Sequence, residues 1–157
     1  MRYLKTQYAP TMDSNHIFSA EERVWRKAKW KEQCEKYNAV LSEQRECFTK
    51  KVLKYIAYAS LHDFYIKDFH CYRTKLKKRH KFIIEIEFYD KYNDKTVLVK
   101  YDDVKCVNSS VDLNGYLGFG DYLYGELFYE NQMYTHNFVI IFDSEISITC
   151  KRIMIYD

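Results

Sequence analysis

Proline and glycine are scarce in this chain. Pro10 is the only proline, and four glycines occur among 157 residues. This composition excludes collagen-like, low-complexity and flexible-linker sequences. No run of eighteen apolar residues is present, so we expect no membrane-spanning helix and no membrane partner. The start of the chain, Met1–Lys5, also lacks the apolar run of a signal peptide.

A strong charge of one sign is absent as well. Lys and Arg number 25 against 22 Asp and Glu, and the formal charge of +3 is mixed along the chain. A dedicated nucleic-acid binder is therefore disfavoured. The five cysteines are odd in number and widely spaced, which predicts neither a disulfide framework nor a zinc site. A cytoplasmic location is the simplest interpretation, and we expect no cofactor.

Aromatic residues are abundant, at 18% of the chain with 16 Tyr and 10 Phe, and they suit half-buried strands. The pattern changes at Leu61-His62-Asp63, from helical before this point to strand-like after it. We therefore divide the chain into residues 1–60, an N-terminal segment with a helical arm, and residues 61–157, an antiparallel β domain. At this length the two parts should form one compact unit.

The helical part begins with a recognisable signal. Ser19 and Glu22 have the spacing of a capping box, in which each side chain accepts a hydrogen bond from the other's backbone. Neither Gly nor Pro follows before Ala59, and apolar residues recur at three and four positions. One helix of about forty residues would be unusually long. We expect two helices, with a bend near Tyr37-Asn38-Ala39.

Beyond residue 63 apolar and polar residues alternate, as in half-buried strands. Residues 104–107 extend the third strand or form a further short one, so the count is six or seven. Short connections favour antiparallel pairing. The predicted fold class is α+β: N-terminal helices and then a mainly antiparallel sheet shaped as a roll, small sandwich or partial barrel. The expected strands are residues 64–72, 82–89, 97–101, 122–129, 138–142 and 146–155.

Several local features depart from regular strands. The basic run Lys75–Lys81 is predicted to be a hairpin turn, and Asn108–Gly120 to be the longest loop. Gly125, inside a strand, indicates a bulge or a close backbone approach. The alternation changes phase after Cys150, which predicts a bulge near Lys151-Arg152. Each cysteine has apolar neighbours and is expected to be a small core residue.

Catalytic signals are weak. His62 and Asp63 are the sharpest candidates, because an imidazole and a carboxylate can perform acid–base chemistry in a small hydrolase. Adjacent strand residues point to opposite faces, however, which favours a structural role at the helix-to-strand junction. The other histidines do not complete a metal site with His62. We predict no catalytic and no metal-ligating residues, and hence a protein that is not an enzyme.

A Tyr-rich, acidic segment is the preferred candidate for function. Tyr offers large contact area at low entropy cost, and acidic neighbours suit a basic partner. Because side chains alternate, part of these tyrosines should face outward; the alternative is that they only cover the sheet. The predicted face, which would bind another protein, consists of Tyr116, Asp121, Tyr122, Tyr124, Glu126 and Glu130.

The basic run supplies a second hypothesis, a nucleic-acid-binding module. Its side chains could contact phosphates, with aromatic residues nearby for stacking. Glu85, Glu87 and Asp90 follow at once and would repel a polyanion, so nucleic acid is the less favoured partner. The residues of this alternative site are Lys75, Lys77, Lys78, Arg79 and Lys81.

The N-terminal octapeptide Met1–Tyr8 and the Leu61-His62-Asp63 element resemble a group of uncharacterised bacterial proteins, chiefly from Firmicutes. Those proteins begin with an aromatic YFTK-x-x-Y-like segment and continue through helices to a Leu-His-Asp element and a β-rich half. Here Leu4 replaces the aromatic residue, and the helical part is shorter. Proteins of this style include immunity-protein-like members of toxin systems. The resemblance implies this style of fold and a non-enzymatic role. Our hypothesis is an immunity-like protein that binds and neutralises a bacterial toxin.

Overall fold

The computed structural model describes residues 2–9, 18–58, 60–76, 79–110, 120–140 and 144–157. It confirms the predicted α+β class, in which N-terminal helices precede an antiparallel sheet. In chain order the elements are η1 (Thr6–Tyr8), α1 (Ala20–Glu43), η3 (Arg45–Cys47), α2 (Lys50–Val52), the π-helical turn η4 (Leu53–Ala57), β1 (Tyr65–Leu76), β2 (Arg79–Asp90), β3 (Lys95–Ser109), β4 (Tyr122–Glu130), β5 (Met133–Ile140) and β6 (Ser144–Tyr156).

Helix α1 starts at the predicted capping box. The Glu22 N–H donates to Ser19 Oγ at 3.2 Å, and the Ser19 N–H donates to Glu22 Oε2 at 2.8 Å. The bend predicted near residues 37–39 is wrong, because α1 continues to Glu43 and Tyr37 is buried in its interior. Helix α1 ends at Glu43, and the 3-10 turn η3 follows it. Helix α2 starts where Thr49 caps it, accepting from the Val52 N–H at 3.3 Å.

The sheet has six strands in the order β1-β2-β3-β6-β5-β4, and all neighbours are antiparallel. Its two edge strands meet at one end, where Tyr65 and Asp121 form a single antiparallel bridge. Beside that bridge the Tyr122 N–H donates to the Phe64 carbonyl at 2.7 Å. The sheet therefore curls round until its first and last strands touch.

Two predictions about the strands need correction. Lys75 and Lys81 lie within β1 and β2, with Lys75 opposite His80, so most of the predicted basic turn is strand. The irregularity expected near Lys151-Arg152 is in β3, the neighbouring strand. Asp103 has no partner on β2, and Lys105 has none on β6. Residues 104–107 belong to β3, so the described part of the chain has six strands.

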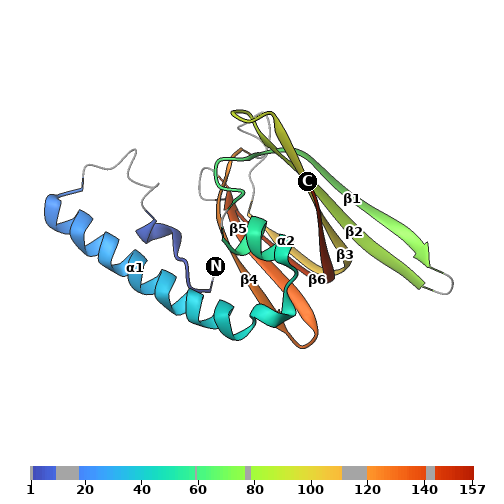
Figure 1. Cartoon of the computed structure of the whole chain (residues 1–157), viewed down its shortest axis with the longest axis horizontal. Helices are drawn as coiled ribbons and strands as arrows, with labels where there is room; N and C mark the ends of the chain where they lie inside the picture. Colours follow the sequence, from blue (N-terminus) through green and yellow to red (C-terminus); the bar gives the residue numbers. More distant parts are fainter. Residues whose placement is uncertain (1, 10–17, 59, 77–78, 111–119, 141–143) are drawn as a thin grey trace.

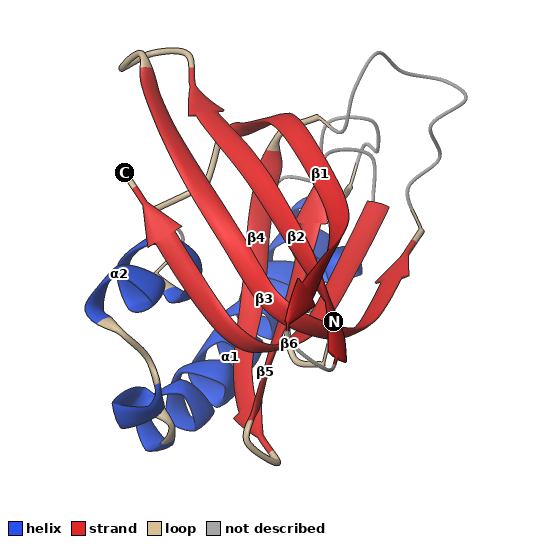
Figure 2. Ribbon diagram, turned by 90° about the vertical axis from the view of Figure 1, so that its right-hand side faces the viewer, coloured by secondary structure: helices blue, strands red, loops and turns tan. Residues whose placement is uncertain are grey.

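Because the sheet curls, one of its faces packs against itself. Phe88 on β2 contacts Tyr122 on β4, with ring centroids 5.8 Å apart. The other side of β4 is covered by α1, where Trp30 lies 5.0 Å from Tyr124 (Figure 1). Figure 2 shows β1, β2 and β3 in front of the helices, so their outer face points away from both α1 and α2. Among the described residues, no helix combines the length and apolar character needed to cross a lipid bilayer.

Candidate functional site

The predicted aromatic–acidic face is not an exposed surface. Tyr122 and Glu126 are 0% exposed and Tyr124 is 7% exposed. A register shift between Tyr122 and Tyr124 sends their side chains to opposite sides of β4, where the sheet interior covers Tyr122 and α1 covers Tyr124. Asp121 is half-buried at the bridge to Tyr65. Tyr116 lies outside the described residues.

Glu126 binds the chain's own N-terminal segment. Its Oε2 accepts from the Arg2 N–H at 2.6 Å, its Oε1 accepts from the Tyr3 N–H at 2.6 Å, and Oε1 also accepts from the Leu4 N–H. The Arg2 guanidinium then pairs with Glu130 at 2.5 Å. Two of the three carboxylates expected to meet a basic partner, Glu126 and Glu130, are therefore occupied by residues 2–4 of the same molecule.

A histidine lies at the centre of the curled sheet. His136 Nδ1 is 2.7 Å from Tyr101 Oη, and its Nε2 is 3.3 Å from Tyr122 Oη. Burial lowers the pKa of His136 to about 3, so the imidazole is neutral and accepts from one tyrosine while donating to the other. Gly125 confirms the predicted close approach, since a Cβ there would lie 2.9 Å from His136 Nε2. All three polar side chains are fully buried, so this network serves the fold.

His62 and Asp63 lie in a turn rather than on a strand. Their side chains therefore meet, with His62 Nδ1 2.9 Å from Asp63 Oδ1, and both side chains are exposed, at 41% and 67%. Asp63 has a left-handed backbone with φ 67°, a conformation in which Asp is enriched. Its N–H donates to the Tyr122 carbonyl at 3.1 Å. The backbone of Asp63 thus joins the junction to β4, while the His62–Asp63 side-chain pair lies at the surface.

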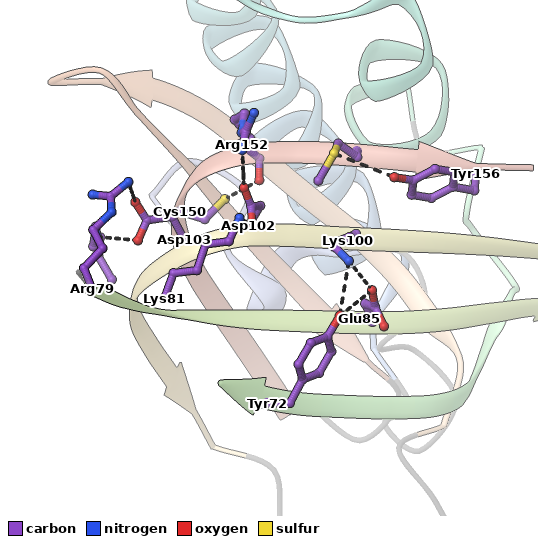
Figure 3. A network of polar contacts seen from close by, with 12 residues as sticks. Tyr72, Arg79, Lys81, Glu85, Lys100, Asp102, Asp103, Cys150, Arg152 and Tyr156 are labelled. Carbon is purple, nitrogen blue, oxygen red and sulfur yellow. Dashed lines mark hydrogen bonds and ion pairs between the residues drawn. The ribbon is translucent and has the colours of Figure 1, made fainter. Parts of the chain in front are cut away.

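A pocket of about 460 Å³ opens on the outer face of β2, β3 and β6 (Figure 3). Asp102 lies at its base and is 2% exposed. It accepts from Lys81 Nζ at 2.5 Å and from Arg152 Nη2 at 2.6 Å and Nε at 3.2 Å. The lining residues are Arg79, Lys81, Asp102, Asp103, Lys151 and Arg152.

Paired carboxylates position the cations of this pocket. Burial alone would raise the pKa of Asp102, but the hydrogen bonds from Lys81 and Arg152 outweigh it and lower that pKa. The hydrogen bond from Lys105 likewise lowers the pKa of Asp103, which also lies 3.7 Å from Arg79. Both carboxyl groups are therefore ionised at neutral pH and fix their partners by charge.

The pocket keeps a net positive charge after these internal ion pairs are formed. The lining holds four cationic side chains against two carboxylates, a net charge of +2. Lys151 forms no ion pair with any residue that the structure describes. The Arg152 guanidinium, 67% exposed, is held at one side by Asp102 and has further N–H donors available. Such a planar, pre-oriented fork suits a carboxylate or a phosphate.

Sequence reasoning found half of these cations. Arg79 and Lys81 belong to the predicted basic site, whereas Lys75 lies on β1 outside the lining, and Lys77 and Lys78 lie outside the described residues. Lys151 and Arg152 were missed, although the phase change at those positions was visible. That change exposes two consecutive residues of β6 and so brings both side chains to the pocket.

The cysteines form no comparable site. All five are free thiols, and Cys150 is buried as expected, but Cys47, Cys71 and Cys106 are exposed, which corrects the prediction that each is a core residue. Within the described part of the chain, no group of three or more His, Cys, Asp and Glu side chains could hold a metal ion. No family model matches the chain, and neither a curated protein nor a solved structure matches it.

Proposed function

We propose that this protein acts without catalysis, by binding an acidic protein partner at the pocket between β2, β3 and β6. The observation that carries the proposal is the set of four cations that line the pocket, of which Lys81 and Arg152 are held by Asp102 and Arg79 lies 3.7 Å from Asp103. The charge of the partner is thus opposite to the one predicted from the Tyr-rich segment, whose acidic side chains Glu126 and Glu130 are occupied internally.

The surroundings of the pocket favour a protein over a nucleic acid. Tyr72 and Tyr156 are exposed on the same outer face, at 36% and 52%, and offer rigid contact area (Figure 3). Lys100 and Glu85 form an ion pair at 2.6 Å, and the Tyr72 hydroxyl bonds to both, so charges of both signs lie on this face. A mixed pattern of charges gives specificity for a protein surface, because a protein can present complementary charges of both signs.

The resemblance at the N-terminus and at Leu61-His62-Asp63 suggests that the partner is a bacterial toxin. Neutralisation would then consist of covering an acidic surface of that toxin. Co-expression with the product of an adjacent toxin gene tests this role directly. We expect the wild-type protein to restore growth, and a Lys151→Glu/Arg152→Glu double variant to fail at an equal expression level.

Binding at the pocket is testable before the partner is known. The probe is poly-glutamate, titrated into the protein and measured by calorimetry. Reversing Lys151 and Arg152 should weaken binding by about tenfold or more, equivalent to ~1.4 kcal/mol. The matched control reverses Lys27 and Lys31 on α1, which are exposed and change net charge equally. Equal losses in the two double variants would show that only net charge matters, and would overturn the pocket.

Nucleic acid stays as the second candidate because Arg79 and Lys81 of the basic hairpin line the same pocket. A single-stranded RNA and a poly-glutamate of equal charge separate the two. Tighter retention of the RNA at physiological salt, lost when Arg79 and Lys81 are neutralised, would favour the nucleic-acid function. A steep decrease of affinity with salt should accompany it.

A further inference from the structure

The two edges of the sheet are treated differently. On β4, the outward N–H groups are covered by α1: the Leu127 N–H donates to Tyr37 Oη at 2.7 Å, and the Tyr129 N–H donates to Gln44 Oε1 at 2.8 Å. β1, the opposite edge, is 12 residues long, and among the residues that the structure describes it pairs only with β2 beyond its bridge at Tyr65. Long uncovered edges are uncommon, because they offer a template for another strand.

The direction of the free groups follows from the antiparallel register. Leu76 pairs with Arg79, and the Phe69 N–H bonds to Asp68 Oδ1 at 2.8 Å rather than to β2. Groups directed toward and away from the neighbouring strand alternate along such an edge. Cys71, Arg73 and Lys75 therefore direct their N–H and C=O groups away from β2.

We propose that the free edge of β1 binds an extended acidic segment of the partner protein, which adds to the sheet as a further strand. This inference rests on the proposed function and names its binding mode. Arg73 and Lys75 are exposed on this edge, and Arg79 of the pocket lies opposite the end of β1, one strand away. Main-chain bonds would supply affinity, and the cations would select acidic side chains.

Charge also argues against a second copy of this chain as the occupant. Lys67, Arg73 and Lys75 outnumber Asp68 on β1, so two such edges would repel each other when paired. An acidic strand experiences the opposite effect. The same basic residues thus protect the free protein from self-association and select the partner.

The experiment uses a peptide of about ten residues in which Glu alternates with Val, and measures amide exchange by NMR. Binding should slow exchange at Cys71, Arg73 and Lys75 by about tenfold or more, because their N–H groups gain partners. The amides of Tyr72 and Thr74, already directed to β2, should change little. A peptide with Lys in place of Glu is the charge control and should not bind.

Cys71→Pro removes one outward N–H without changing charge, and edge positions tolerate Pro. It should weaken peptide binding about tenfold, whereas Cys71→Ala should bind as wild type does. A peptide N-methylated at alternate residues tests the same bonds without altering the protein, and it should fail to bind.

The outcomes separate this inference from the proposed function. Peptide binding that depends on Lys151 and Arg152 but leaves the β1 amides unprotected would overturn the edge and preserve the pocket. If the peptide slows exchange of the β1 amides equally in the wild type and in Lys151→Glu/Arg152→Glu, the β1 edge is the binding site and the proposed role of the pocket is wrong. A concentration-dependent dimer that protects the same amides without peptide would assign the edge to a second copy and overturn the proposal.

Discussion

Two buried carboxylates of one sheet, Glu126 on β4 and Asp102 on β3, have opposite uses. Glu126 is 0% exposed and accepts from three backbone N–H groups of the N-terminal segment. Asp102 is 2% exposed and accepts from the side chains of Lys81 and Arg152. The first carboxylate ties the chain to itself, and the second holds cations toward solvent.

The difference lies in how readily the partners can return to water. Arg152 is 67% exposed and can be rehydrated without moving the backbone. The N–H groups bound by Glu126 belong to a segment packed over Phe128, where Arg2 lies 4.3 Å from the ring centroid. A buried donor left without an acceptor bears the full desolvation cost. We therefore expect Glu126 to stabilise the fold and Asp102 to shape the site.

Glu126→Ala should have the largest effect on stability. It leaves the Arg2, Tyr3 and Leu4 N–H groups without their acceptor, and should lower the free energy of unfolding by about 3 kcal/mol. Urea denaturation measures the loss, and amide exchange should accelerate at residues 2–4. Glu130→Ala is the control, because its exposed ion pair with Arg2 should contribute less than ~1 kcal/mol. Equal losses of unfolding free energy in Glu126→Ala and Glu130→Ala would contradict a special stabilising role for Glu126.

Gly125→Ala tests whether the two sides of β4 contribute to stability independently. Its Cβ would be forced onto the His136 network, opposite the side that holds Glu126. Overpacking of this kind should cost about 2–3 kcal/mol. Amide exchange at residues 2–4 should follow the global loss and show no separate opening. If amide exchange at residues 2–4 accelerated more than the global loss of stability explains, the change at Gly125 would be acting through β4 on the Glu126 side as well.

His136 makes stability depend on pH. Its folded pKa of about 3 lies below the ordinary 6.5, so below pH 6.5 the unfolded chain binds a proton that the folded chain does not. Its contribution is complete above pH 6.5 and decreases as pH falls toward 3. Between pH 6.5 and 5 the free energy of unfolding should fall by roughly 2 kcal/mol. In His136→Gln the slope over this interval should be flatter, and an unchanged slope would exclude His136 as its source.

Asp102→Ala should have a smaller effect on stability than Glu126→Ala, about 1–2 kcal/mol, since the exposed Arg152 can turn to solvent. The loss should shrink in ~1 M NaCl, where the Debye length is about 3 Å. The loss in Glu126→Ala should change less with salt, because its partners are neutral amides. Urea denaturation at low and high salt measures both losses. If salt reduced the loss of unfolding free energy equally in the two variants, the two carboxylates would have the same role.

Local sequence patterns predicted the structure correctly where a residue's conformation depends on its neighbours in sequence. The Ser19–Glu22 capping box, the alternation in β2 and the unusual position of Gly125 needed only a few adjacent residues to be recognised. The bend in α1 was misplaced because an apolar stripe says nothing about where β4 will pack. The same limit hid the Tyr101–His136 contact, which joins residues 35 positions apart.

Periodicity and composition were sufficient for the α+β class, the antiparallel pairing and the start of α1, because hydrogen-bond geometry and alternation act over short stretches of chain. Which side chains are exposed could be learned only from the folded molecule. Strict alternation would place Tyr122 and Tyr124 on one face, but the register shift between them sends them to opposite sides, and α1 and the curled sheet bury both. Likewise, Lys81 and Arg152 are 71 positions apart and become one pocket only because β2, β3 and β6 are neighbours around Asp102.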